Sequence, residues 1–427
     1  MTASDTIFAL SSGTPPAGVG VIRVSGPAAR EALLALAGRV PEPRRASLAR
    51  LRDGEGELLD EALVLWFPGP RTATGEDLAE FHCHGGRAVV AAIERALASL
   101  RGVRRAEPGE FTRRAFANGR IDLAEAEGLA DLLSAETEMQ RAAALANAGG
   151  ALSRQVEGWR ERVLGLSAEV EGVLDFSDEE DSADLPACFT WNIGALADEL
   201  AVRLARPRSE RLGEGFRVVL AGPPNAGKST LFNALVESEA AITSPIAGTT
   251  RDVIERSVAI GGVPFTFVDT AGLREGSSDA IEAIGIERAR GAVTRADVVL
   301  WLGPEGEGPE DAWEIAAQAD RDGIPANPRA QFTLSAMTGE GVSALKSALV
   351  EAARAALPTP GEAALNARQH ARLAEAEEAL QAAKGLSDPL LAAEELRRAR
   401  LAFDRLIGRA TTEDMLDTLF GRFCIGK

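Results

Sequence analysis

The first part of the chain alternates short apolar runs with amphipathic segments. Residues 20–24 and 63–67 have the length and composition of strands. Residues 27–37 begin with a proline, which suits the first turn of a helix, and residues 87–100 repeat apolar residues on one helical face. This mixture predicts an α+β domain over residues 1–118.

The pattern then changes to helix and later to a second mixture of strands and helices. The segment after the α+β part is rich in Ala, Glu, Leu and Arg and has few helix breakers. Apolar strands alternate with helices further on, at residues 216–221, 263–268 and 296–302, which is typical of a parallel sheet. Helical sequence returns after the Pro-Thr-Pro at 358–360.

An α/β segment between two helical segments predicts an insertion. We expect an α+β domain at residues 1–118, a helical domain built from residues 119–213 and 358–427, and an inserted α/β domain at residues 214–357.

Composition narrows the class of protein. The sequence has 427 residues, a formal net charge of -18, and three dispersed cysteines, Cys83, Cys188 and Cys424, which favour a reducing compartment. No secretory signal is evident at the start, and no run approaches the roughly 18 apolar residues that span a bilayer. We expect a cytoplasmic protein without a membrane span, whose surface as a whole does not bind nucleic acid non-specifically.

A phosphate-binding motif follows the strand at 216–221. Residues 222–229 read GPPNAGKS and satisfy G-x-x-x-x-G-K-[ST], so backbone N–H groups are expected to hold phosphates at the start of a helix. Lys228 is expected to reach the β- and γ-phosphates, and Ser229 to ligate Mg²⁺.

The order of motifs downstream points to a GTPase-type domain. Thr250 is placed to complete the Mg²⁺ ligands, and Asp269 to act as a further magnesium partner after its strand. The N–H of Gly272 is placed for the γ-phosphate. The predicted fold is therefore an α/β P-loop GTPase domain inserted into an all-α domain and preceded by an α+β domain.

Two positions depart from the usual GTPase pattern. Leu273 stands where Ras-type GTPases carry the glutamine that orients water. Ala317-Gln318-Ala319-Asp320 replaces the guanine-reading N-K-x-D, so Asp320 can accept from guanine N1 and N2 while the Asn and Lys contacts are missing. Ser335-Ala336 resembles the last guanine-contact loop. Guanine is favoured over adenine, but selectivity and affinity stay open.

Motifs outside the α/β domain carry a family resemblance. These are GVGVIRVSG at 18–26, EDLAEFHCHGG at 76–86, PGEFTRRAF at 108–116, NGRIDL at 118–123 and FCIGK at 423–427. Together, and in this order over the whole chain, they resemble the MnmE (TrmE) family of tRNA wobble-uridine modification GTPases.

The resemblance implies two sites besides the phosphate loop. In that family the N-terminal domain binds a formyl-tetrahydrofolate and pairs in a homodimer, and the folate-contacting positions match Arg23, Glu80, Arg120 and Lys427. The role of Cys424 stays open between lining the site and chemistry. A potassium ion is implied at Asn225, Ser244, Ile246 and Thr249, and Glu282 matches a glutamate that positions water.

The motifs and the resemblance together give one nucleotide-contacting set, in which Lys228 and Glu282 are the expected catalytic residues. The set is Asn225, Ala226, Gly227, Lys228, Ser229, Thr230, Ser244, Pro245, Ile246, Ala247, Gly248, Thr249, Thr250, Asp269, Thr270, Ala271, Gly272, Asp320, Ser335 and Ala336.

The resemblance also implies partners and a reaction. A K⁺-stimulated GTPase works with a flavoprotein (MnmG in this family) in a heterotetrameric complex and adds an aminomethyl-type group, such as carboxymethylaminomethyl, at C5 of the wobble uridine of certain tRNAs. The partner is expected to make most of the tRNA contacts. Two alternatives stay open: a ribosome-assembly GTPase, and a folate-binding switch with little hydrolysis.

His82 and His84 form an H-x-H pair beside two glycines, where we predict a loop. Neither a Cys pair nor a carboxylate stands at ligand spacing, so a metal site is not favoured and their function stays open.

Overall fold

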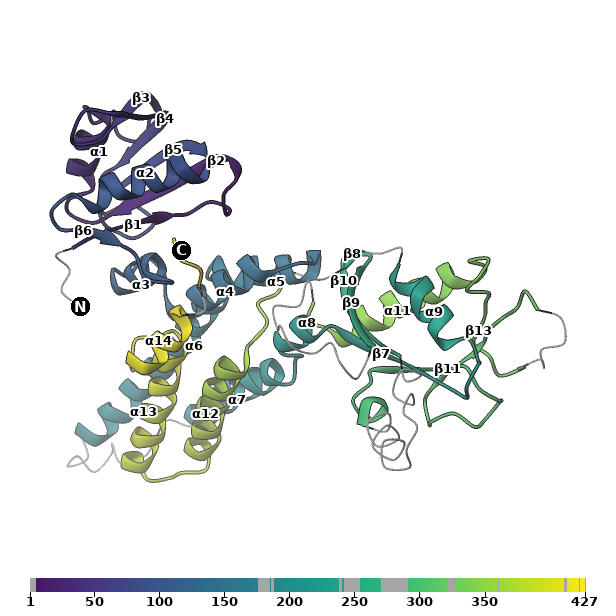
Figure 1. Ribbon diagram of the computed structural model, residues 1–427. Coiled ribbons are helices and arrows are strands. Elements are labelled where there is room, and N and C mark those ends of the chain that lie inside the picture. Colours follow the sequence, from purple (N-terminus) through teal and green to yellow (C-terminus); the bar gives the residue numbers. More distant parts are fainter. Residues whose placement is uncertain are drawn as a thin grey trace, which may run out of the picture. The chain divides into compact units, whose positions relative to one another are not determined.

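The computed structural model describes residues 5–175, 185, 188–237, 240–241, 254–269, 291–321, 327–359, 361–410, 413–421 and 423–426. It divides into two compact units (Figure 1). Unit 1 consists of Met1–Ala130 with Asp404–Lys427, and unit 2 consists of Asp131–Phe403.

Unit 1 is built on a six-stranded sheet with the order β3-β4-β5-β2-β1-β6. Most neighbours are antiparallel, and β1 pairs in parallel with β6. The strands are β1 Thr6–Leu10, β2 Ala17–Ser25, β3 Ser47–Arg52, β4 Leu58–Phe67, β5 Leu78–Gly85 and β6 Val103–Arg105.

Two helices, α1 (Ala29–Ala37) and α2 (Arg87–Ala98), pack on the same face of this sheet (Figure 1). Along β4 the side chains alternate, so that Val64 and Trp66 enter the core beneath the helices while Leu63 is exposed. The opposite face carries a smaller apolar cluster that includes Phe111 of α3 (Glu110–Ala117). The predicted mixture of strands and helices is confirmed, although the first helix begins two residues after Pro27.

Unit 1 also contains the end of the sequence. The N–H of Leu123, the first residue of helix α4 (Leu123–Ser134), donates to the carbonyl of Ile407, which follows helix α13 (Pro389–Leu406) in sequence. Helix α14 (Glu413–Phe420) packs against α3, and Phe116 and Phe420 lie 6.1 Å apart between ring centroids.

Unit 2 contains a group of helices and a seven-stranded sheet. Helices before and after the sheet in sequence pack together: α12 lies on α7, and Trp159 of α6 stacks on Phe403 of α13 at 6.1 Å. Two of them begin with capping boxes, at Thr137 and at Asn366. The helices are α5 Glu138–Ala148, α6 Ala151–Asp175, α7 Phe189–Leu204, α8 Glu210–Glu214 and α12 Ala367–Lys384.

The seven-stranded sheet has the order β13-β12-β11-β7-β10-β9-β8. From β13 to β10 the strands are parallel, and β9 and β8 continue the sheet antiparallel. They are β7 Phe216–Ala221, β8 Ala240–Ala241, β9 Ile254–Ile260, β10 Val263–Asp269, β11 Val298–Trp301, β12 Trp313–Ala316 and β13 Phe332–Thr333. Helices α9 (Lys228–Val236) and α11 (Val342–Ala356) contribute to the core on one face. The predicted parallel sheet is confirmed at all three expected strands.

Across the part of the chain that the structure describes, none of the helices has the length and apolar character needed to cross a bilayer.

Candidate functional site

The phosphate loop connects the carboxyl end of β7 to the first residue of α9. Gly222 and Gly227 both adopt positive φ (148° and 96°), and a Cβ at Gly222 would lie 3.1 Å from the carbonyl carbon of Leu302. Glycine at these places allows the tight turn. Lys228 is buried, and its Nζ donates to the carbonyls of Gly222 and Pro223 at 3.0 and 2.7 Å, so the ammonium lies within the curve of the loop.

The two predicted magnesium partners are in direct contact. Ser229 Oγ donates to Asp269 Oδ2 at 2.7 Å, and Asp269 is buried at the end of β10. This contact follows from topology, because β7 and β10 are parallel neighbours whose carboxyl ends lie at one edge of the sheet. A hydroxyl and a carboxylate oxygen form a donor set that suits Mg²⁺.

The loop after β12 lies against the phosphate loop. Gln318 Nε2 donates to the carbonyl of Asn225 at 3.1 Å, and Gln318 Oε1 accepts from Arg321 at 3.2 Å. The Ser335 hydroxyl donates to the Asp320 carboxylate, and this bond is the largest cause that lowers the pKa of Asp320. The structure thus brings Asp320 and Ser335 together.

The sheet of unit 1 pairs two of the predicted folate contacts. Arg23 on β2 lies opposite Glu80 on β5 and donates to its Oε1 from Nε and Nη2 at 3.1 and 2.9 Å. His82 Nε2 lies 3.0 Å from the other oxygen, Oε2. Burial raises the pKa of Glu80, but the bond to His82 and the charge of Arg23 outweigh it, so the pKa is lowered and the carboxylate stays ionised.

The predicted loop at His82 and His84 is wrong, because both residues lie within β5. Alternating residues of a strand share a face, but the two rings have different partners: His82 contacts Glu80, and His84 Nδ1 lies 2.8 Å from Asp60 Oδ1. Within the described residues no group of three His, Cys, Asp or Glu side chains is arranged to hold a metal ion.

Arg120 is held on a loop next to these strands. Its Nε donates to the carbonyl of Thr72 at 3.2 Å, and Asn118 donates to the carbonyl of Thr74 at 2.7 Å. Thr74 in turn is 2.6 Å from the hydroxyl of Ser25 at the end of β2. Arg120 is therefore attached through this loop to the strand that carries Arg23.

Residues 423–426, here named the closing segment, lie against the start of the chain. Ile425 forms a bridge with Pro108, and the Ser11 hydroxyl donates to the carbonyl of Gly426 at 2.8 Å. Gly426 has a φ of 96°, and a Cβ there would collide with the carbonyl oxygen of Leu10. Cys424 is exposed.

A buried ionic network, which the sequence interpretation missed, underlies the PGEFTRRAF motif. Glu110 has a side chain only 2% exposed and accepts from Arg104 at 2.6 Å and from Arg114 at 3.0 Å. Arg114 also pairs with Asp5 at 2.8 Å and with Glu76 at 3.2 Å. The i,i+4 spacing of Glu110 and Arg114 was the available signal.

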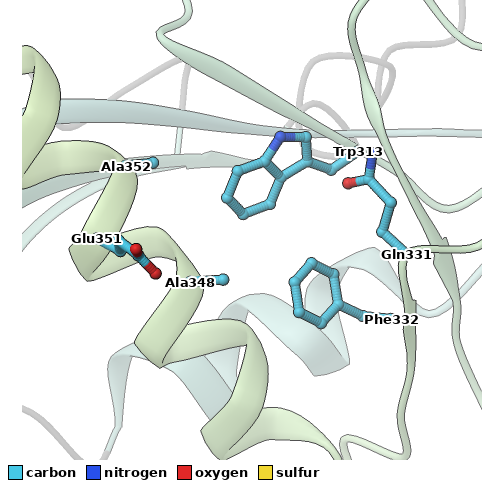
Figure 2. Close-up of a pocket in the computed structure, with 6 residues that line it drawn as sticks. All are labelled: Trp313, Gln331, Phe332, Ala348, Glu351 and Ala352. Atoms are coloured by element: carbon cyan, nitrogen blue, oxygen red, sulfur yellow. The ribbon is translucent and has the colours of Figure 1, made fainter.

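An apolar groove lies between strands β12 and β13 and helix α11 of the α/β domain (Figure 2). The rings of Trp313 and Phe332 are 5.7 Å apart, and Gln331, Ala348, Glu351 and Ala352 complete the lining. Trp313 and Phe332 are the first residues of their parallel strands, whereas the phosphate loop follows the end of β7. The groove is therefore not the nucleotide site.

Several predicted site residues lie outside the described residues. They are Ser244, Pro245, Ile246, Ala247, Gly248, Thr249, Thr250, Thr270, Ala271, Gly272, Glu282 and Lys427.

A phosphate loop after a central parallel strand, with serine and aspartate side by side at its end, defines a P-loop nucleoside triphosphatase of the GTPase type. The chain belongs to the MnmE family. Residues 6–120 match the family model described as GTP-binding protein TrmE N-terminus, and residues 123–424 match that of the MnmE helical domain.

Relatives of nearly full length carry the same family name. The tRNA modification GTPase MnmE of Erythrobacter litoralis (strain HTCC2594) is 67% identical over 423 residues, covering 99% of this chain and 100% of the relative. That of Novosphingobium aromaticivorans is 64% identical over 436 residues, with 99% and 100% covered. This chain is accordingly a GTP hydrolase.

Solved structures add similarity over part of the chain. The G domain of the T. maritima FeoB iron transporter is 27% identical, with a TM-score of 0.22, and covers 32% of this chain and 98% of its own. Era in complex with MgGDPNP and a 16S ribosomal RNA segment is 21% identical, with a TM-score of 0.25. The match covers 49% of this chain and 98% of the Era chain.

Proposed function

We propose that this chain is a K⁺-stimulated GTPase that modifies C5 of the wobble uridine in certain tRNAs together with a flavoprotein partner, MnmG. The product carries an aminomethyl-type group, such as carboxymethylaminomethyl, and a folate supplies its one-carbon unit. The observation that carries the folate part is the contact of the closing segment with Leu10 and Ser11. Leu10 lies on β1, and the residue before it, Ala9, pairs with Arg23 of β2.

The folate site consists of Arg23, Glu80, Arg120 and Lys427. The ionised Glu80 is an acceptor for N–H groups of a pterin edge, and cationic side chains suit the carboxylates of a folate tail. Arg23 holds Glu80 in a fixed orientation through two bonds to one carboxylate oxygen. Cys424 of the closing segment is exposed, so its side chain is available to a ligand.

The nucleotide site combines the phosphate loop with residues of two later segments of the sequence, 244–250 and 269–282. Lys228 neutralises charge on the β- and γ-phosphates, and Ser229 with Thr250 ligates Mg²⁺. Asn225, Ser244, Ile246 and Thr249 hold K⁺, which supplies positive charge near the phosphates. Glu282 positions the attacking water in place of the glutamine that is missing at Leu273.

The α/β domain at residues 214–357 is inserted into a helical domain made of residues 119–213 and 358–427. The packing of α7 on α12, which flank the sheet in sequence, supports this arrangement. The protein acts in the cytoplasm as a homodimer, pairs through residues 1–118, and forms a heterotetramer with the flavoprotein. The net charge of -18 fits a division of labour in which the partner makes most of the tRNA contacts.

A reconstituted reaction tests the proposal. Undermodified tRNA, glycine, a tetrahydrofolate one-carbon donor, the flavoprotein and GTP are mixed with the chain, and the wobble nucleosides are analysed by mass spectrometry. We expect a modified uridine that depends on GTP and on the folate. Unmodified uridine despite a partner that is active with another MnmE would refute the assignment.

Phosphate release distinguishes this function from a folate-binding switch with little hydrolysis, which the Ala317–Asp320 departure favours. The proposed enzyme hydrolyses GTP faster in K⁺ than in Na⁺. A switch shows near-zero rates in both salts.

A further inference from the structure

The loop assigned to base recognition, residues 317–320, carries the methyl group of Ala317 where N-K-x-D has the amide of its asparagine. Ala317 directly follows β12, is partly buried, and packs against the core of the α/β domain together with Ala226 of the phosphate loop and Ala336. Guanine displays N7 and O6 as acceptors on one edge, and an asparagine amide at this place of N-K-x-D serves that edge. A methyl group provides no hydrogen-bond donor.

For the other edge of guanine, which carries N1–H and the N2 amine, the loop provides a hydrogen-bond acceptor that is held in place. Asp320 is held by the hydroxyl of Ser335, which is fully buried and also accepts from the N–H of Thr338 at 3.2 Å. The N–H of Ala319 donates to the carbonyl of Leu334 at 3.1 Å, so both loops are also joined through their backbones. An ionised carboxylate in this position accepts from guanine N1–H and the N2 amine.

Gln318 keeps this loop in place without the usual lysine. Its amide nitrogen bonds to the carbonyl of Asn225 and lies 3.1 Å from the position of a Cβ at Gly227, while its oxygen accepts from Arg321. The loop is therefore attached to the phosphate loop by a neutral amide. The contact holds the loop that carries Asp320 against the phosphate loop, and the methyl group of Ala317 offers no hydrogen-bond donor to N7.

We propose that this GTPase recognises guanine through the N1 and N2 groups that Asp320 accepts from, and that it is indifferent to N7. The proposal rests on the assignment of Asp320 as the guanine reader. It predicts an unusual nucleotide preference, in which a base that lacks only N7 binds as well as guanine.

Equilibrium binding of three diphosphates to the full chain tests this. 7-Deaza-GDP, in which carbon replaces N7, is expected to bind within about twofold of GDP, because no hydrogen bond is lost. Inosine diphosphate, which lacks the N2 amine, is expected to bind about tenfold or more weakly, because a bond to a carboxylate is lost. A tenfold loss with 7-deaza-GDP would overturn the proposal.

The two analogues separate failure of the proposal from failure of the site assignment. If inosine diphosphate binds as tightly as GDP, Asp320 does not read the N2 amine and the assigned guanine site is itself wrong. If inosine diphosphate is weak and 7-deaza-GDP is weak as well, the site is right but N7 is read by another group, and the proposal alone fails.

A gain-of-contact variant provides a second measurement. Ala317→Asn is expected to tighten GDP about fivefold and leave 7-deaza-GDP unchanged, so that discrimination at N7 appears. Ala319→Asn adds the same amide at an exposed position two residues along the loop and serves as the matched control. Equal gains for GDP and 7-deaza-GDP in Ala317→Asn would contradict the proposal. If Ala317→Asn does not fold, the comparison of diphosphates on the natural chain decides alone.

Discussion

Asn225 has a left-handed backbone conformation in the phosphate loop, with a φ of 62°. Asparagine tolerates this conformation better than most residues with a Cβ, and glycine tolerates it without cost. The position therefore allows the side chain to be removed while the loop keeps its backbone.

Asn225→Gly is expected to abolish K⁺ stimulation and leave the phosphate loop intact. Electrostatic groups at a transition state contribute on the order of 10²-fold, so the ratio of hydrolysis rates in K⁺ and Na⁺ is expected to fall at least about tenfold. Steady-state phosphate release in matched salts measures it. Asn225→Asp keeps a side-chain oxygen and is the control; undiminished K⁺ stimulation in the glycine variant would exclude Asn225 as a ligand.

Glu110→Gln is expected to destabilise unit 1 by about 3 kcal/mol, since it leaves the buried charge of Arg114 and the half-buried charge of Arg104 short of one partner. Urea unfolding at neutral pH measures the change. Glu42→Gln breaks the exposed pair with Arg45 and is expected to change stability by less than about 0.5 kcal/mol. Equal effects of the two variants would mean that burial of the network contributes nothing.

The same network predicts a pH dependence. Burial raises the pKa of Glu110, but hydrogen bonds from Arg104, from the N–H of Glu107 and from Arg114, together with the charge of Arg104, outweigh it, so its pKa in the folded chain is below the ordinary 4.5. A lowered folded pKa stabilises the fold above the unfolded pKa, and this stability is lost as the pH falls through the folded value. The stability difference between the natural chain and Glu110→Gln is therefore expected to shrink below about pH 4.5. A difference that is constant between pH 7 and pH 4 would contradict this.

At this scale the sequence predicts the phosphate site well and the ionic network poorly. Lys228 and Ser229 are neighbours in a motif whose backbone shape is set by its glycines, so their roles follow from spacing. The arginines that hold Glu110 also pair with Asp5 and Glu76, which are distant from them in sequence and are brought to them only by the fold. Spacing along the chain carries no record of such contacts.

Elements show the same division between local and distant causes. Strands β7 and β10 were predictable because every residue of β10, and nearly every residue of β7, is buried, which leaves a continuous apolar run in the sequence. Strands β12 and β13 were not, because they are short and half-buried and owe their existence to pairing with β11 and with each other.

Thr137→Ala is expected to weaken α5 by about 1 kcal/mol, because it removes an N-cap. The Thr137 hydroxyl accepts from the N–H of Gln140 at 3.3 Å, and Gln140 Oε1 accepts from the N–H of Thr137 at 2.9 Å. Thermal unfolding of unit 2 measures the effect. Thr137→Ser keeps the hydroxyl and is the matched control; a serine variant as destabilised as the alanine variant would show that the cap is not the cause.

At the scale of the whole molecule, the motifs outside the α/β domain identify the family, but only the structure of unit 1 shows that two of them are in contact. In the sequence, FCIGK and PGEFTRRAF are separate motifs, far apart along the chain. The structure brings them into contact through the bridge between Ile425 and Pro108. Such a contact between distant parts of the chain depends on the fold of everything between them, and no local pattern predicts it.

Gly426→Ala is expected to displace the closing segment, because the added Cβ collides with the Leu10 carbonyl and the φ of 96° is strained for alanine. Folate affinity, measured by calorimetry with formyl-tetrahydrofolate, is expected to fall about tenfold or more, while GTP hydrolysis in K⁺ stays within about twofold. Gly13→Ala, where a Cβ meets nothing, is the control. Unchanged folate affinity in Gly426→Ala would remove the closing segment from the proposed site.

The discontinuous build of unit 1 has a consequence for the order in which the protein matures. Residues 1–130 leave the ribosome first, but residues 404–427, which complete the same compact unit, are synthesised only after all of residues 131–403. Domains generally fold in the order of their synthesis, yet this one must wait for its last segment. A nascent chain interrupted within unit 2 therefore carries residues 1–130 in which Ser11 and Pro108 have not yet met Gly426 and Ile425.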